Sequence, residues 1–409
     1  MRKEDLLEGL RLQAVRVLRA CEVMHPGKPG LRLHFPSGDM KYKSFWVRDA
    51  AMMAESRLID AREIKGWIGH IMDKGIHAGA ELLLENGLSV PPYAVADHIH
   101  FEYGGVFFPG PDMGVKNQGN GTYGFHPPHC DSYFFIEMVH VYHDMTGDLS
   151  YVLGLLDLLE KVFQAYDIDK ATQLCTSPYP AHTVDWGFCD TVVKSGSLLF
   201  SSLLRWRAAL RLAGFFMEAG DDEKASSYRE AAGVIRENIL ANFTDPSGWL
   251  LSATGHCRQK DVWGTAFALW LDILPELQKK AAAKALLAEY RRKRTIRHGY
   301  VRHIPEDEDF SEETAWEKAS CLLGEYQNGG YWATPLGWVA HGVSLVDVNA
   351  AFGMLEDYLN HTLEFGDKGA PYEWKTADDT AASGCLYGTS ATMPFLGLER
   401  IIHLPLCSP

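Results

Sequence analysis

The sequence predicts an all-α fold, an (α/α)6 barrel in which six antiparallel helical hairpins form two concentric rings. Apolar residues recur at a spacing of about 3.6 residues in twelve segments of the chain. These segments alternate between helices with a charged side and helices that are apolar or small nearly all round. Division of the 409 residues among six hairpins leaves about 68 for each, enough for two helices and their connections. We therefore expect one domain, residues 1–409.

The composition of each helix indicates the ring to which it belongs. Residues 221–243 and 275–292 carry charge along one side, as solvent-facing helices do. Residues 196–212 and 332–345 are apolar or small on every side, so they must be enclosed. A doubly wound α/β sheet would need repeated Val- and Ile-rich strands between helices, and the sequence has none. The expected helices are 4–24, 48–59, 62–77, 131–146, 150–166, 196–219, 221–243, 260–273, 275–292, 331–345, 347–364 and 388–402.

The charge balance argues against several classes of partner. The chain has 39 basic and 53 acidic residues, a formal charge of −14, and no basic run, so nucleic acid is not an expected partner. The start of the chain has no signal-peptide pattern, and no run of 18 apolar residues occurs, which argues against a membrane partner. Eight cysteines without a CxxC pair are typical of free thiols in a reducing compartment. We expect a soluble, cytoplasmic protein, and the sequence leaves its oligomeric state open.

The connections that precede the enclosed helices are long and rich in Gly, Pro and aromatic residues. The longest, residues 85–130, has the length of a functional loop. Because all the long connections precede inner helices, we expect them to meet at one mouth of the ring. Trp and Tyr side chains at a concave mouth are suited to stacking on the apolar face of a sugar.

Two patterns in the longest connection admit other interpretations. Gly119 to Gly124 matches the dinucleotide-binding pattern GxGxxG, but the following Pro127-Pro128 is unsuited to the helix that the motif requires, so we expect a plain loop. Two groups, Asp97–His100 and His126–Asp131, contain metal-ligand types. Without an HExxH or a paired CxxC motif, we expect them to bond sugar hydroxyls or to pack within the loop. No metal and no organic cofactor is expected.

A few carboxylates lie in aromatic, Gly-rich contexts just before enclosed helices. A carboxyl group desolvated by tryptophan has a raised pKa, as a general acid requires. Two such groups about 6.5–9.5 Å apart perform inverting glycoside hydrolysis. Asp49 and Asp261 also fit a simpler role, the stabilisation of a helix N-terminus. The carboxylates in this class are Asp49, Asp185, Asp190, Glu325 and Glu373.

The order of these motifs resembles the six-hairpin (α/α)6 glycosidases, especially the glucoamylase and trehalase-like group. Residues 45–50, Phe-Trp-Val-Arg-Asp-Ala, look like the Trp-x-Arg-Asp signature that opens the first inner helix of that group. The resemblance implies that Arg48 and Asp49 bind hydroxyls of the sugar in the −1 subsite. Asp131, before the second inner helix, corresponds to another substrate-contacting Asp of the group.

The resemblance also implies the catalytic pair. Residues 185–190, Asp-Trp-Gly-Phe-Cys-Asp, occupy the loop that carries the general acid in this group, but they have extra residues between the two acids, so the acid is either Asp190 or Asp185. Tyr372-Glu373-Trp374 looks like the segment of the general base. Arg258 with Asp261, and Tyr326 with Trp332, resemble substrate-contacting runs before the fourth and fifth inner helices. Glu325 remains open as an alternative base.

We therefore expect an exo-acting, inverting glycoside hydrolase that releases one terminal sugar from an oligosaccharide or glycan. The alternatives are an unsaturated uronyl hydrolase, for which Arg48, Arg258 and Arg302 offer cations, an acylglucosamine-type 2-epimerase that works through paired histidines, and a glycan-binding toroid without catalysis. The residues expected to contact the sugar are Trp46, Arg48, Asp49, Asp131, Trp186, Arg258, Asp261, Glu325, Tyr326, Trp332 and Trp374.

Overall fold

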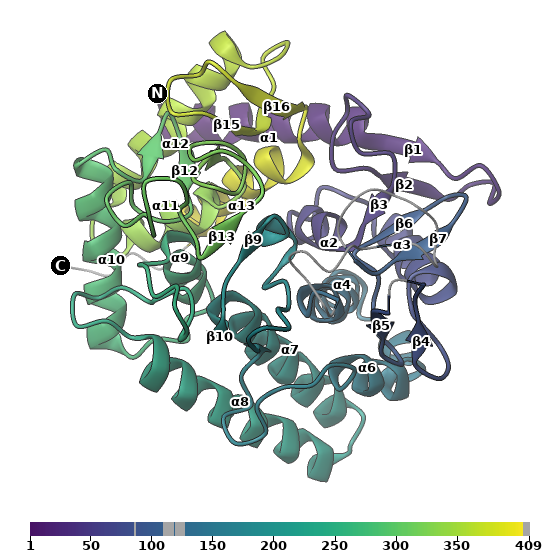
Figure 1. Cartoon of the computed structure of the whole chain (residues 1–409). Helices are drawn as coiled ribbons and strands as arrows, with labels where there is room; N and C mark the ends of the chain where they lie inside the picture. Colours follow the sequence, from purple (N-terminus) through teal and green to yellow (C-terminus); the bar gives the residue numbers. More distant parts are fainter. Residues whose placement is uncertain (86, 109–117, 119–126, 404–409) are drawn as a thin grey trace.

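A computed structural model describes residues 1–85, 87–108, 118 and 127–403. Within these residues the chain forms thirteen α-helices and sixteen strands of two to four residues. The helices enclose the centre of the molecule, and the short strands lie in the connections between them (Figure 1).

Six helices form a closed inner ring, since each contacts the next and the last contacts the first. Small residues allow two of them to approach closely: a Cβ on Gly397 would lie 2.4 Å from Cα of Gly337. The inner helices are α2 (Val47–Glu55), α4 (Cys130–Thr146), α7 (Leu199–Glu218), α9 (Val262–Trp270), α11 (Leu336–Ser344) and α13 (Gly388–His403).

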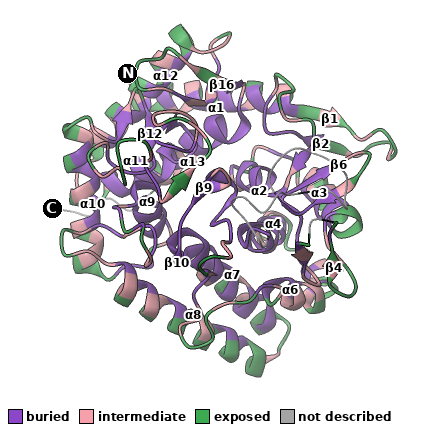
Figure 2. Ribbon diagram, viewed as in Figure 1, coloured by how far each residue is buried: buried purple, intermediate pink, exposed green. Residues whose placement is uncertain are grey.

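The outer helices alternate with the inner ones along the chain and follow the periphery of the ring (Figure 1). Their exposed faces contrast with the buried inner ring (Figure 2). Outer helices commonly begin with a capping aspartate, such as Asp221 of α8 and Asp347 of α12, which accepts a backbone N–H bond. The outer helices are α1 (Lys3–Cys21), α3 (Ala61–Lys74), α5 (Leu149–Leu153) with α6 (Leu156–Phe163), α8 (Asp222–Phe243), α10 (Glu276–Arg291) and α12 (Val348–Phe365).

Every expected helix is present, which confirms the predicted all-α (α/α)6 fold. The differences are local. Segment 150–166 is interrupted at Gly154 and forms α5 and α6. Segments 196–219 and 331–345 begin later than expected, because Gly196–Ser197 and Tyr331–Trp332 are extended and pair with strands earlier in the same connections.

The connections differ in length at the two ends of the ring. Those from an inner to an outer helix are short, such as 219–221 and 345–347, whereas those from an outer to an inner helix are long, such as 292–335. The long connections before the inner helices agree with the prediction, and they carry short strands that the sequence did not predict. A five-stranded antiparallel sheet combines β11 (Ile296–Arg297), β12 (Tyr300–Arg302), β14 (Tyr331–Trp332), β15 (Tyr372–Lys375) and β16 (Ala382–Cys385).

The other strands form smaller antiparallel sheets, some within one connection and some between two connections. β3 (Phe45–Trp46), β6 (His98–His100) and β7 (Gly104–Val106) form three strands. The two-stranded pairs are β1 (Glu22–Met24) with β2 (Arg32–His34), β4 (Leu82–Leu83) with β5 (Ser89–Val90), β8 (Thr176–Ser177) with β10 (Gly196–Ser197), and β9 (Val192–Val193) with β13 (Lys318–Ala319).

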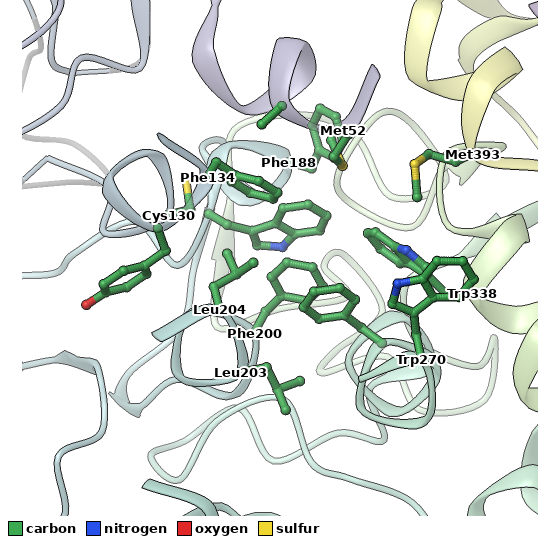
Figure 3. Packing of buried hydrophobic residues seen from close by; sticks show 14 of the residues in the cluster. Met52, Cys130, Phe134, Phe188, Phe200, Leu203, Leu204, Trp270, Trp338 and Met393 are labelled. Atoms are coloured by element: carbon green, nitrogen blue, oxygen red, sulfur yellow. The ribbon is translucent and has the colours of Figure 1, made fainter. Parts of the chain in front are cut away.

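Aromatic side chains fill the interior of the ring beneath the mouth (Figure 3). The ring of Trp186 stacks on Phe200 with centroids 3.7 Å apart, and Phe200 packs in turn against Phe267 and Trp338. The interior of the ring is therefore a packed core. In the part of the chain that the structure describes, none of the helices has the length and apolar character needed to cross a bilayer.

Candidate active site

A pocket opens where the long connections meet, and it encloses about 550 Å³ including its opening. Its walls come from five of these connections and from the first turn of α2, so segments far apart in sequence converge on one small space. The residues that line it are Pro36, Tyr42, Trp46, Arg48, Asp97, His98, Gly187, Phe188, Asp190, Tyr326, Glu373 and Tyr387.

Arg48 is the centre of a buried charge cluster on one wall. The pairing of Trp46 with His98 in strands β3 and β6 brings the start of α2 beside Asp97. Arg48 Nη1 donates to Asp97 Oδ1 at 2.7 Å and lies 3.7 Å from Asp131 Oδ1. Its Nε lies 3.5 Å from Asp49 Oδ2, so three carboxylates surround one guanidinium.

The three carboxylates do not share the positive charge equally. Burial opposes ionisation of Asp97, but the Arg48 charge and a hydrogen bond with His98 hold its pKa at about 2. Burial raises the pKa of Asp49 to about 6, although Arg48 and the hydroxyl of Tyr387, which donates to it at 2.8 Å, oppose the shift. Burial and the neighbouring Asp97 charge raise the pKa of Asp131 well above its ordinary value. The ionised Asp97 is therefore the main counter-charge of Arg48.

Asp190 lines the same pocket and directly follows a short 3-10 turn, Gly187–Cys189. Burial and the Asp97 charge raise the pKa of Asp190 to about 6, while Arg48 and a hydrogen bond with Gln327 oppose the shift. Its Oδ1 is buried without a close hydrogen-bond partner among the described residues. A carboxyl group in this setting can hold a proton near neutral pH and give it to a bound substrate.

Asp185, the other candidate acid, lies outside the pocket lining and is fully engaged within the protein. Its Oδ2 accepts from Lys194 at 2.5 Å, and both side chains are almost completely buried. Its Oδ1 accepts from the N–H and the hydroxyl of Ser201. These bonds anchor the connection to the start of α7 and favour Asp190 as the pocket acid.

Glu373 lies on β15 and lines the same pocket. The Tyr42 hydroxyl donates to its carboxylate at 2.6–2.7 Å, and Lys41 Nζ lies 3.3 Å from Oε2. Burial nevertheless raises the pKa of Glu373 to about 7. Gly384 on the neighbouring strand has φ of +68°, and a Cβ there would lie 2.6 Å from Cβ of Glu373. Only glycine suits that position, because it satisfies both the backbone and the close approach.

Aromatic rings form the remaining walls. Trp46 stacks on His98 with centroids 4.3 Å apart, and Tyr326 and Phe188 face the pocket from other connections. Trp332 is buried behind them: it packs 5.2 Å from Phe188, and its Nε1 donates to the carbonyl of Tyr326.

Several predicted sugar-contacting residues lie outside the pocket lining. Trp186 is completely buried in the ring interior, where it packs on Phe200, and the structure gives it and Trp332 packing roles. Asp261 is a buried helix cap whose carboxylate accepts from Gly264 N–H. Arg258 is exposed, and Glu325 is half-buried away from the pocket lining.

Two more of the predicted residues support the pocket from outside its lining. Asp131 approaches it only through Arg48. Trp374 packs edge-on against Tyr326, with centroids 5.9 Å apart. The structure thus brings together Trp46, Arg48, Asp49, Asp190, Tyr326 and Glu373, with Asp49 reaching the pocket through Arg48 and Tyr387.

Sequence reasoning assigned no sugar-binding role to Tyr42 or Tyr387, which both line the pocket. Each lies within a few residues of an inner helix, so the rule that selected Asp49 and Asp190 also applies to them. Asp97 and His98 belong to a group expected to bond sugar hydroxyls or to pack within the loop, and the structure places them in the pocket lining as partners of Arg48 and Trp46.

Among the described residues, one group offers three potential metal ligands, and it lies away from the pocket. It consists of His298, His361 and Asp379. The ammonium of Lys375 lies 2.6 Å from Asp379 and 3.3 Å from His361, so a lysine takes the place that a cation would need. His126 and the Gly119 to Gly124 run lie outside the described residues, and the described members of the other predicted group, His129 and Asp131, do not line the pocket.

The chain resembles solved glycosidases in structure. No protein-family model matches it, and no curated protein matches it in sequence. A GH63 mannosylglycerate hydrolase from Thermus thermophilus, in complex with glucose, has a TM-score of 0.62 at 15% identity and covers 95% of this chain and 99% of its own. A rhamnosidase from Klebsiella oxytoca has a TM-score of 0.62 at 12% identity, over 97% of this chain and 64% of its own.

A further solved protein described as a glycosidase matches 98% of both chains at 13% identity, with a TM-score of 0.61. At such low identities the likeness shows the fold and does not assign roles to individual residues. The alternation of helices, the closed inner ring and these matches agree on one conclusion: the chain has the six-hairpin (α/α)6 toroid of known glycosidases.

Proposed function

We propose that this protein is an exo-acting, inverting glycoside hydrolase that releases one terminal sugar from a small glycoside or oligosaccharide. The observation that carries the proposal is that Asp190 and Glu373 line one small pocket and both have pKa values raised by burial. A hydrolase of this class needs such a pair, one carboxyl to donate a proton and one carboxylate to accept one.

In the proposed reaction, protonated Asp190 gives its proton to the glycosidic oxygen as the bond from that oxygen to the anomeric carbon breaks. Glu373 takes a proton from a water molecule, whose oxygen forms the new bond to the anomeric carbon from the opposite face. The configuration at that carbon is inverted, and both carboxyl groups exchange protons with solvent before the next cycle. The separate placement of the two groups, on the 187–190 turn and on β15, supports these roles.

The charge cluster around Arg48 would bind the sugar. Arg48 and Asp97 present fixed donors and acceptors to hydroxyl groups, and Trp46 offers a ring face for stacking. The pocket volume of about 550 Å³ including its mouth suits one sugar ring rather than a long chain. This limited space supports the exo-acting part of the proposal.

Both alternatives on the same fold meet an obstacle. A uronyl hydrolase needs a free cation for the substrate carboxylate, but Arg48 is already surrounded by carboxylates, and Arg302 is held by Asp309 and the carbonyl of Gly329. Arg258, the third predicted cation, lies outside the pocket lining. A 2-epimerase needs a pair of histidines, and His98 is the one histidine among the described residues that line the pocket.

The name of one structural neighbour bears on substrate size. The Thermus thermophilus protein is described as a mannosylglycerate hydrolase, an enzyme for a sugar linked to a small aglycone. A compact substrate of this kind fits the enclosed pocket described above, and we include glycosides of small hydroxy acids among the candidates.

The experiment is proton NMR of the wild-type protein with α- and β-linked disaccharides, glycosyl glycerates and uronides, followed from the earliest minutes. We expect a released sugar whose anomeric configuration is opposite to that of the substrate. A product of retained configuration, exchange at C2 without cleavage, or cleavage of uronides alone would each contradict the proposal.

The variant Glu373→Gln should lose turnover by about 10³-fold or more, because the water loses its base, while binding of the product sugar persists. Glu325→Gln is the matched control. Its carboxylate precedes the same kind of helix but lies outside the pocket lining, so we expect near-normal rates. Residual activity above a tenth in Glu373→Gln, or loss of activity in Glu325→Gln, would overturn the assignment.

A further inference from the structure

The turn that carries Asp190 is held at both ends by one buried side chain. Gln327 lies on the connection before α11 and is only 2% exposed. Its Oε1 accepts from the N–H of Thr191 at 2.7 Å and from the Thr191 hydroxyl at 2.8 Å. Its Nε2 donates to the carbonyl of Gly187 at 3.2 Å. The amide therefore spans residues 187 and 191, with Asp190 between them.

Gln327 is itself fixed from behind. Its backbone carbonyl accepts from Trp316 Nε1 at 2.9 Å, and the neighbouring Asn328 accepts from the N–H of Ala315 at 2.7 Å. Trp316 and Asn328 are both buried. A side chain anchored in this way has little freedom to move, so it can hold the turn in a fixed position in the pocket wall.

The amide also acts on the carboxyl group. A hydrogen bond from Gln327 lowers the pKa of Asp190 and so limits the increase that burial causes. An uncharged donor at this position orients the carboxyl group without placing a second charge in the pocket.

We propose that Gln327 is a positioning residue for the general acid: its amide clamps the 187–191 turn and fixes the direction in which Asp190 presents its proton. The inference rests on the proposed function, because it requires Asp190 to be the acid. It goes beyond that function in assigning the alignment of the acid to a residue outside the pocket lining.

The test compares two substrates of the same sugar, a disaccharide cleaved by the wild type and the corresponding glycosyl fluoride. Fluoride departs with little help from a general acid, whereas the second sugar of a disaccharide departs through its hydroxyl oxygen, which needs protonation by the acid. A misplaced acid therefore slows cleavage of the disaccharide and leaves cleavage of the fluoride unchanged. Loss of the base or of sugar binding slows both.

Gln327→Met keeps the length of the side chain and removes the amide. We expect kcat on the disaccharide to fall by about 10- to 100-fold, with KM and the rate on the fluoride each within about threefold of wild type. Gln259→Met is the matched control, because Gln259 is also buried and uses its amide within the protein, donating to Ala315 and accepting from Cys257. Gln259→Met should change the rates on the two substrates equally.

A second variant, Gln327→Glu, keeps the acceptor for Thr191 but places a carboxylate near Asp190. We expect the basic limb of its pH profile to move to higher pH, because a like charge disfavours ionisation of the acid. Melting temperatures confirm that the variants are folded. The inference is wrong if either Gln327 variant lowers the rates on both substrates equally. It is also wrong if the variants leave the disaccharide turnover and the basic limb of the pH profile unchanged.

Asp190→Asn separates this inference from the function on which it rests. A selective loss on the disaccharide supports Asp190 as the acid, and the Gln327 result then decides the inference alone. An equal loss on both substrates removes the acid assignment itself, and the positioning role falls with it.

Discussion

Gly187 is the position where one added methyl group should do most damage to the pocket. A Cβ at residue 187 would lie 1.6 Å from Nη1 of Arg48 and 1.9 Å from its Cζ. Nonbonded heavy atoms prefer separations of about 3.5–4 Å, so Gly187→Ala must push the guanidinium away by about 2 Å. The guanidinium is buried among carboxylates, so such a shift moves it off the positions that its ion pairs require.

The displaced guanidinium loses its 2.7 Å bond to Asp97, and that carboxylate is then buried without its main counter-charge. Removal of one partner from a buried ion pair costs about 3–5 kcal/mol of folding free energy. We expect Gly187→Ala to lower the free energy of unfolding by about 3 kcal/mol and kcat/KM by at least about 100-fold, since the sugar-binding groups move with Arg48.

Guanidinium chloride unfolding and steady-state kinetics measure both effects. Gly233→Ala, on the exposed side of α8 with open space around it, is the control for the same chemical change. It should increase stability by about 0.5–1 kcal/mol, because alanine favours the helix interior more than glycine does. If Gly187→Ala stays within about 0.5 kcal/mol of wild type and keeps its activity, the close packing of Arg48 on residue 187 is not what holds the cluster.

Two further predictions concern the ionisation of Glu373. Lys41→Met removes the cation that opposes the raised pKa of Glu373, so we expect the acidic limb of the pH–rate profile to move to higher pH by about one unit. Kinetics from pH 5 to 9 measure this limb, and an unchanged limb would contradict the role of Lys41. The second is a stability effect. Because the folded pKa of about 7 exceeds the ordinary 4.5, the contribution of Glu373 to stability is fully present below about pH 4.5 and is lost as the pH rises through 7. Glu373→Gln should therefore reduce the difference in unfolding free energy between pH 5 and pH 8 by about 3 kcal/mol. Denaturant titrations at the two pH values measure this difference, and a variant that keeps the wild-type difference would contradict the raised pKa of Glu373.

The opposed pKa values also shape the activity profile. Asp190 is protonated mostly below its pKa of about 6, and Glu373 is ionised mostly above about 7. The productive combination is thus a minority of the free enzyme, with its maximum midway, near about pH 6.5. A bell-shaped profile of kcat/KM around that value is the expected consequence.

The helical architecture could be predicted because packing imposes periodicity. Helices such as α7 and α11 are enclosed on nearly all sides, so their apolar composition identified them as the inner ring. The short strands could not be predicted, since runs such as Gly196–Ser197 have too few residues for a pattern. Their pairing depends on partners many residues earlier in the same connections, and these extended residues are why two inner helices begin later than their apolar segments do.

The site was partly predictable for a related reason. In this toroid a residue just before an inner helix lies near the mouth, which selected Asp190 and Glu373, whereas Arg48 came from the family resemblance. The same rule could not separate Asp190 from Asp185, because the difference depends on Lys194, whose side chain pairs with Asp185. The role of Asp97 was also hidden, since it follows from the register of β3 with β6.

The aromatic residues that the sequence placed on the sugar show how the fold divides its side chains. A ring interior as wide as this one must be filled, and Trp186 fills it by stacking on Phe200 and meeting Trp263 edge-on. Trp186 also precedes Gly187 directly, so its burial fixes the start of the turn that carries Asp190. Packing and the proposed catalysis are therefore coupled through one short segment: the tryptophan anchors it below, the Gln327 amide holds it at the side, and the glycine leaves room for Arg48. On the proposed function, these contacts keep Asp190 desolvated because they restrict the segment around it.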